Sequence, residues 1–456
     1  MDSEDKDKQL SDAEHHSVKL DPWLNTRYSW VICACCATMN FCIWGLNSGF
    51  AVYFQHFLHD DTFPGATKLD YSFIGGISYG AMLAFTPLTN WIWVRLGKYG
   101  LTTIISVGTV CQFAALMLAS WSTKIWQLYL TQGLLLNVGL SLISMASLTL
   151  PSMYFSKDRR GLPSSISAGT SGLGGVLFNL MCGRIVEINS VGWALRAQAF
   201  IILALMLFPI CVARDRPEMR VFPKANFGIY KSIPFYWLSL YTITSTFGYL
   251  VLLYTLGSFV TSLGYSQDQG FLVSALVNLG SVVGRILIGY LSDFPKTGVL
   301  STTIIAHSIC CVLCLAMWIP ARNYATCVAF ALLVGAVMGS IFGMLAPSCA
   351  RIWGDEVMRY SFSNQWALLG ISAVFSPPIG TSLTKFSGGE VNPKSFQDCS
   401  IWVGVCYFVS VTMLLLIRGY VKARDGLILN NPNNPQPHIP MKMVFTHMFT
   451  LRYDRV

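Results

Sequence analysis

Twelve apolar stretches, each of about twenty residues or more, follow one another along this chain of 456 residues. They lie at about residues 29–54, 71–95, 101–120, 125–155, 164–185, 193–213, 235–263, 270–292, 299–320, 325–350, 360–384 and 400–421. A helix of about twenty apolar residues crosses the hydrocarbon core of a bilayer. The chain is 12% charged, against roughly 25% in soluble domains. The pattern predicts an all-α membrane protein with twelve transmembrane helices and excludes a soluble protein.

The longest polar segment between these stretches, residues 214–234, divides them into six and six. The halves also resemble each other, since Asp70 and Phe73 open the second stretch as Asp268 and Phe271 open the eighth. Repeated halves are common among secondary transporters. We therefore expect two six-helix halves at residues 29–213 and 235–422, a central loop at 214–234, and tails at 1–28 and 423–456.

The distribution of lysine and arginine predicts the orientation in the membrane. With the N-terminus inside, the inner loops hold thirteen basic residues, while the outer loops and their edges hold seven. Cytoplasmic loops carry the basic excess in membrane proteins. We therefore expect both tails and the central loop to be cytoplasmic and residues 57–70 to lie outside. The net charge of +9 then reflects membrane topology, and the lipid bilayer, not nucleic acid, is the expected partner.

One basic residue, Arg285, falls deep inside a predicted span, away from the tails, loops and span edges that hold the other basic residues; it lies eight residues or about 12 Å of helix before Asp293. Burying an arginine in hydrocarbon is unfavourable by about 2.5 to 3.5 kcal/mol, so a cavity or a partner must solvate it. Ser274, Asn278 and Ser281 precede it at spacings of four, three and four, which places all of them on one helix face. This face predicts a central cavity in which Arg285 binds an anion. A structural arginine bonded to helix carbonyls is the alternative.

Two other stretches carry weaker polar faces. The first contains Asn40, Trp44, Asn47 and Ser48, and the fourth contains Asn137, Ser141 and Ser144. We take Asn47, Ser48 and Asn137 as candidate substrate-binding residues, together with Arg285, Ser281 and Asn278. Packing is an equal alternative for these two faces, because small polar side chains often bond the carbonyls of their own helix.

His307 stands alone in the ninth stretch, where an imidazole could handle protons, although a packing role is the more frequent one. None of the 22 acidic residues falls inside a predicted span, so any coupled proton would travel on His307 or on the substrate's own carboxyl. Cys310, Cys311 and Cys314 lack a histidine or carboxylate at ligand spacing. The residues also form no nucleophile–base pair. We therefore predict no enzyme activity, no metal site and no cofactor.

Several segments resemble known transporters. Residues 284–293 (GRILIGYLSD) resemble the signature between helices 8 and 9 of the major facilitator superfamily. Residues 154–160, followed by a glycine-rich helix, resemble a conserved stretch of the monocarboxylate transporter family. Residues 193–196 and 62–71 are similar to its fungal branch, the yeast monocarboxylate transporter homologues. The resemblance covers residues 25–422.

This resemblance implies the major facilitator fold and symport of a small carboxylate by alternating access. It implies an integral, multi-pass location in the plasma membrane rather than the vacuolar membrane. The chain departs from animal members at Ser48, where they carry a proton-linked lysine, and at Ser281, where they pair an acid with the arginine. Two alternatives remain open: transport of a vitamin-like solute such as riboflavin, with which the fungal branch is implicated, and a receptor that senses solute without moving it.

Overall fold

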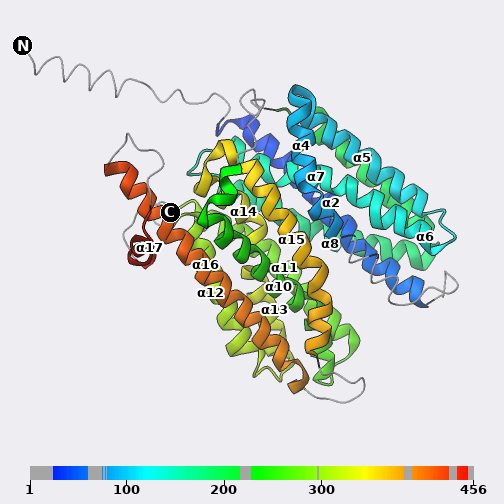
Figure 1. Cartoon of the computed structure of the whole chain (residues 1–456). Helices are drawn as coiled ribbons and strands as arrows, with labels where there is room; N and C mark the ends of the chain where they lie inside the picture. The colour runs from blue at the N-terminus through cyan, green and yellow to red at the C-terminus, as the bar shows by residue number, and fades with distance from the viewer. Residues whose placement is uncertain are drawn as a thin grey trace, which may run out of the picture.

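The structure, a computed structural model, describes residues 24–59, 74, 78, 80–215, 227–294, 297–384, 393–430 and 439–449. Every regular element in these residues is a helix (Figure 1). The first group comprises α2 (Arg27–His59), α4 (Thr86–Leu96), η1 (Gly97–Tyr99), α5 (Gly100–Ala119), α6 (Ile125–Leu128), η2 (Tyr129–Leu135), α7 (Leu136–Tyr154), α8 (Gly161–Ile188) and α9 (Val191–Val212). The second comprises η4 (Phe227–Lys231), α10 (Ile233–Ser262), α11 (Gln267–Ser292), α12 (Gly298–Leu313), η5 (Cys314–Trp318), α13 (Tyr324–Met338), α14 (Ser340–Trp353), α15 (Asp355–Leu383), η6 (Pro393–Phe396), α16 (Gln397–Asn430) and α17 (Met441–Met448).

Ten helical stretches in the described part of the chain are long and apolar enough to cross a membrane. The second predicted span lies partly outside the described residues, and its described end, α4, continues through η1 and α5 as one apolar stretch, Thr86–Ala119. The eleventh predicted span corresponds to α15, a helix of 29 residues that begins with two acids, Asp355 and Glu356. A multi-pass, all-helical membrane protein is therefore confirmed, whereas the count of twelve spans stays a prediction.

The tenth predicted span is interrupted at Gly339, between α13 and α14. Pro347 lies inside α14, which continues through it. A Cβ atom on Gly339 would lie 2.6 Å from Ser281 Oγ and 2.7 Å from Arg285 Nε. The missing side chain therefore lets this break in the helix approach the side chains of α11 closely.

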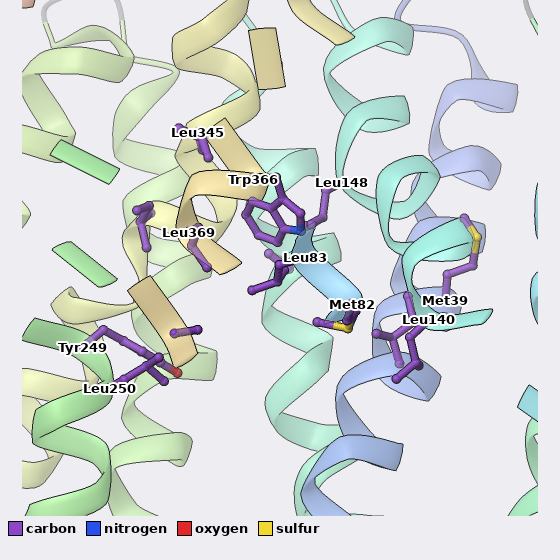
Figure 2. Packing of buried hydrophobic residues seen from close by; sticks show 14 of the residues in the cluster. Met39, Met82, Leu83, Leu140, Leu148, Tyr249, Leu250, Leu345, Trp366 and Leu369 are labelled. Carbon is purple, nitrogen blue, oxygen red and sulfur yellow. The ribbon is translucent and has the colours of Figure 1, made fainter. Parts of the chain in front are cut away.

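The two groups of helices lie side by side (Figure 1) and meet where α8 packs against α11 and where α4 packs against α15. The fit is tight, since a Cβ atom on Gly370 of α15 would lie 2.7 Å from Leu83 Cβ. Figure 2 shows buried side chains from both groups, with Trp366 of α15 near Leu83 and Leu148. All of them belong to one hydrophobic cluster, so the core continues across the contact between the halves.

Polar contacts join the halves at one end of the bundle, which we call the closed end. Asp293, just after α11, accepts hydrogen bonds from the backbone nitrogens of Gly161 (2.9 Å) and Leu162 (2.8 Å) at the start of α8. Arg160 Nη1 lies 2.7 Å from Asp355 Oδ1 at the start of α15. The Asp293 carboxylate satisfies donors at a helix N-terminus and interacts favourably with the helix dipole. Each of these contacts holds one half against the other.

A third cross-half contact lies at the closed end. The Arg359 guanidinium stacks 4.7 Å from the centroid of the Trp93 ring. Trp93 Nε1 donates to Asp215 Oδ1 at 3.1 Å, and the backbone nitrogen of Leu101 donates to Asp215 Oδ2 at 3.0 Å. The start of α15 is thereby held against α4.

Candidate functional site

A cavity of about 500 Å³ lies between the two halves. One wall follows α11 from Phe271 to Arg285, a length of about 21 Å. A neighbouring wall is α8 from Ser171 to Leu180, which packs against α11 and includes Asn179. Aromatic side chains contribute much of the lining: Trp44, Tyr249, Tyr254, Phe271 and Phe342. Among the described residues that line the cavity, Arg285 alone is charged.

Arg285 lies at the junction of three helices and is 7% exposed. Its Nη1 donates to the carbonyl oxygen of Ala168 (2.9 Å) and to Ser171 Oγ (2.7 Å), both on α8 of the other half. Its guanidinium carbon lies 4.9 Å from the centroid of the Phe342 ring on α14. These groups are neutral, and they orient the guanidinium at the wall of the cavity.

The structure places the other predicted residues of α11 on the same wall. Ser274, Asn278 and Ser281 line the cavity with Arg285. Ser281 is 4% exposed, and its Oγ has no hydrogen-bond partner among the described residues. Asn278 Nδ2 makes a long 3.4 Å bond to the carbonyl oxygen of Ser274. The cation is therefore accompanied by a hydroxyl and an amide that can serve a ligand.

Asn137 is fully buried and lies outside the cavity lining. Its Nδ2 donates to the carbonyl oxygens of Gln132 (2.8 Å) and Gly133 (2.9 Å), and its Oδ1 accepts from Ser78 Oγ (3.0 Å). The two carbonyls belong to the π-helical turn η2, so the Asn137 amide stabilises the packing of this turn in the structure. The side chains of Asn47 and Ser48 lie outside the described residues.

His307 is also fully buried and lies outside the cavity lining. Its Nε2 lies 2.9 Å from Ser245 Oγ, and its Nδ1 lies 3.0 Å from the carbonyl oxygen of Thr303. The rings of Tyr241 and Tyr407 flank it, with centroids 5.3 and 5.4 Å away. The structure therefore places His307 among the helices of the second half, where its Nδ1 also lies 3.4 Å from Ser340 Oγ.

Three residues that hold Arg285 were missed by the sequence analysis: Ser171, Phe342 and Gly339. The glycine-rich pattern of α8 was the one available signal for Ser171. It permits close approach to α11, since a Cβ atom on Gly169 would lie 3.5 Å from Ile286 Cγ1. No periodicity in the sequence marks Phe342 or Gly339 as neighbours of Arg285.

Comparison with known proteins identifies the family. The model described as "Major Facilitator Superfamily" matches residues 33–377. "Probable transporter MCH2" of Saccharomyces cerevisiae is 35% identical over 439 residues, which cover 94% of this chain and 91% of that protein. "Agnestins efflux protein AgnL12" of Paecilomyces divaricatus is 27% identical over 86% of this chain and 87% of that protein.

Solved structures show the same fold at low sequence identity. The fucose:proton symporter FucP of E. coli has a TM-score of 0.63 at 12% identity, over 86% of this chain and 99% of that chain. The proton:xylose symporter XylE has a TM-score of 0.63 at 12% identity, over 86% of this chain and 95% of that chain. At this identity the likeness concerns the fold alone.

Proposed function

The chain belongs to the Major Facilitator Superfamily and is a secondary transporter, and we propose that it carries a small organic anion bound by Arg285. The observation that supports this is the single positive charge of Arg285 on the wall of a cavity whose described lining has no carboxylate. A guanidinium binds a carboxylate through two parallel charge-assisted hydrogen bonds. We also propose that the protein belongs to the fungal branch of the monocarboxylate transporter family, which its 35% identity to "Probable transporter MCH2" supports.

We propose that transport proceeds by alternating access, with the two six-helix halves rocking about the cavity. In this structure Arg285 ties α11 to α8 through the Ala168 carbonyl and the Ser171 hydroxyl. A substrate carboxylate makes stronger bonds to a guanidinium than these neutral acceptors do. Substrate binding would therefore compete with the hydrogen bonds from Arg285 to α8, and this competition would lower the energy barrier to movement of the two halves.

A vitamin-like solute such as riboflavin is a second candidate, favoured by the aromatic lining of the cavity. Cavities of about 300 to 1,000 Å³ hold drug-sized ligands, and this one is about 500 Å³. Uptake into proteoliposomes, across a panel of monocarboxylates and riboflavin and with or without a pH gradient, tests both candidates. Uptake of any of them also excludes a receptor that binds solute without moving it.

Replacing Ser281 by aspartate should weaken uptake of an anion. Ser281 Oγ and Arg285 Nε lie close together, since a Cβ atom on Gly339 would be 2.6 Å from the first and 2.7 Å from the second. An aspartate at position 281 would therefore give Arg285 an internal carboxylate one helical turn away. We expect the KM for the anion to rise about tenfold, which corresponds to about 1.4 kcal/mol. Ser281→Asn is the neutral control of equal size, and an unchanged KM in Ser281→Asp would contradict competition for Arg285.

Proton coupling is proposed to use the substrate's own carboxyl rather than His307, because His307 lies outside the cavity lining. His307→Gln keeps a hydrogen-bonding side chain but cannot titrate near neutral pH. We expect the pH dependence of uptake in proteoliposomes to be the same in His307→Gln as in the original chain. Loss of that dependence, with the amount of folded protein unchanged, would assign proton handling to His307.

We propose that both tails and residues 214–234 are cytoplasmic in the plasma membrane, as the basic bias of the loops indicates. The closed end is then the cytoplasmic end, and the cavity faces outward. A tag fused to either terminus should be inaccessible to an impermeant label in intact cells and accessible after permeabilisation. Labelling in intact cells would reverse the orientation.

A further inference from the structure

Helix α17 is fixed against α16 by specific contacts. Val444 is fully buried, and a Cβ atom on Gly419 of α16 would collide with its carbonyl oxygen. Arg418 Nη1 donates to the carbonyl oxygen of Met448 at 2.8 Å, and Arg418 Nε donates to Ser301 Oγ at 3.1 Å. Ser301 belongs to the first turn of α12. These contacts hold α17 at the level where α12 begins, close to one end of the membrane-spanning helices.

The other face of α17 carries large apolar side chains that the protein leaves uncovered. Met441 is 41% exposed, Phe445 is 56% exposed, and Phe449, which follows the helix, is 69% exposed. Residues four apart lie on one face of a helix, so the three form a continuous line, which we call the α17 stripe. A continuous exposed apolar surface marks contact with another protein, a ligand or a membrane.

The position of the α17 stripe favours a membrane. Figure 1 shows α17 along the flank of α16, on the side away from the N-terminal helices. The two helices that hold α17 also expose apolar side chains along their membrane-crossing parts: Ile305, Ile309 and Val312 on α12, and Ile401, Val405 and Phe408 on α16. We expect lipid to cover these side chains, and α17 contacts α16 beyond them along the helix, at the level of Gly419.

Charge around the α17 stripe agrees with this position. Lys442 is exposed beside Met441, and residues 439–449 contain no acid. A short helix with an apolar face and flanking basic residues binds at the boundary between lipid headgroups and acyl chains, and its lysines interact with lipid phosphates.

We propose that α17 is an interfacial helix whose stripe of Met441, Phe445 and Phe449 inserts into the phospholipid leaflet beside Gly419, where the predicted membrane-spanning part of α16 ends. Arg418 fixes the helix at that depth by joining α12, α16 and α17. On the proposed orientation this is the cytoplasmic leaflet. The contact would hold this part of α16 at a constant depth while the halves move.

Photocrosslinking from α17 tests the contact with lipid. Benzoylphenylalanine would replace Phe445 in one full-length variant and its exposed neighbour Thr446 in the other, each reconstituted in vesicles of phosphatidylcholine and phosphatidylserine. After illumination, mass spectrometry should find about tenfold more phospholipid adducts at position 445 than at 446, because only 445 lies in the stripe. Equal yields, or adducts at 445 only with a second copy of the chain, would overturn the proposal.

Hydrogen exchange of the α17 amides provides a second measurement in the same vesicles. Phe445→Glu places a charge in the leaflet and should raise the exchange rate of α17 about tenfold or more, whereas the matched variant Thr446→Glu should leave it unchanged. Both positions are exposed, so neither variant disturbs the helix bundle. Exchange at the original rate in Phe445→Glu would show that the stripe is not in the membrane.

Discussion

Arg285→Ala should abolish transport of an anionic substrate while the folded protein still reaches the membrane. The variant removes the one charged side chain of the described cavity lining, and with it both hydrogen bonds to a carboxylate. Loss of one partner of a buried charged pair weakens binding by about 2 to 5 kcal/mol, so kcat/KM for uptake should fall at least about thirtyfold. Arg285→Lys keeps the charge but loses the planar guanidinium, so its rate of uptake should lie between that of the original chain and that of Arg285→Ala.

Arg196 offers a matched control on α9. Its guanidinium also stacks on aromatic rings, 5.2 Å from the centroid of Trp193 and 5.3 Å from that of Trp121, but it does not line the cavity. Arg196→Ala should therefore leave the KM unchanged, when uptake is divided by the amount of protein in the proteoliposomes. If Arg285→Ala is incorporated normally and transports at the original rate, Arg285 is structural and the anionic-substrate proposal fails.

The wall of the cavity on α11 could be predicted from the sequence because two independent constraints agree there. Helical periodicity placed Ser274, Asn278 and Ser281 on the face of Arg285, and a buried arginine requires polar surroundings. The structure brings all four to one cavity. Whether they bind substrate stays a prediction, since only a transport measurement tests it.

The opposite side of the site could not be predicted, because it depends on how distant helices meet. Ser171 and Phe342 contact Arg285 from α8 and α14, and no local pattern encodes those contacts. Asn137 and Asn278 look alike in sequence, as amides on polar helix faces. Asn278 lines the cavity and Asn137 does not. The Asn137 amide instead donates hydrogen bonds to two backbone carbonyls of the π-helical turn η2.

Asp293→Ala should open the closed end. The carboxylate accepts hydrogen bonds from the backbone nitrogens of Gly161 and Leu162, at the positive end of the α8 dipole. Its loss leaves two donors without their acceptor, and we expect a cost of about 2 kcal/mol, which shifts the equilibrium between the two arrangements of the halves about thirtyfold. Spin labels attached through non-natural amino acids at the exposed positions 159 and 356 would report the distance between the halves, which should increase.

Gly161→Ala should produce the same opening by a steric route, since its Cβ atom would collide with Ser292 Oγ. Glu187→Gln is the control: it removes an acid at the far end of α8, where an exposed ion pair with Arg184 contributes little, and should leave the distance unchanged. If neither Asp293→Ala nor Gly161→Ala changes the distance, apolar packing between the halves must hold the end shut. The polar contacts would then be a consequence of closure rather than its cause.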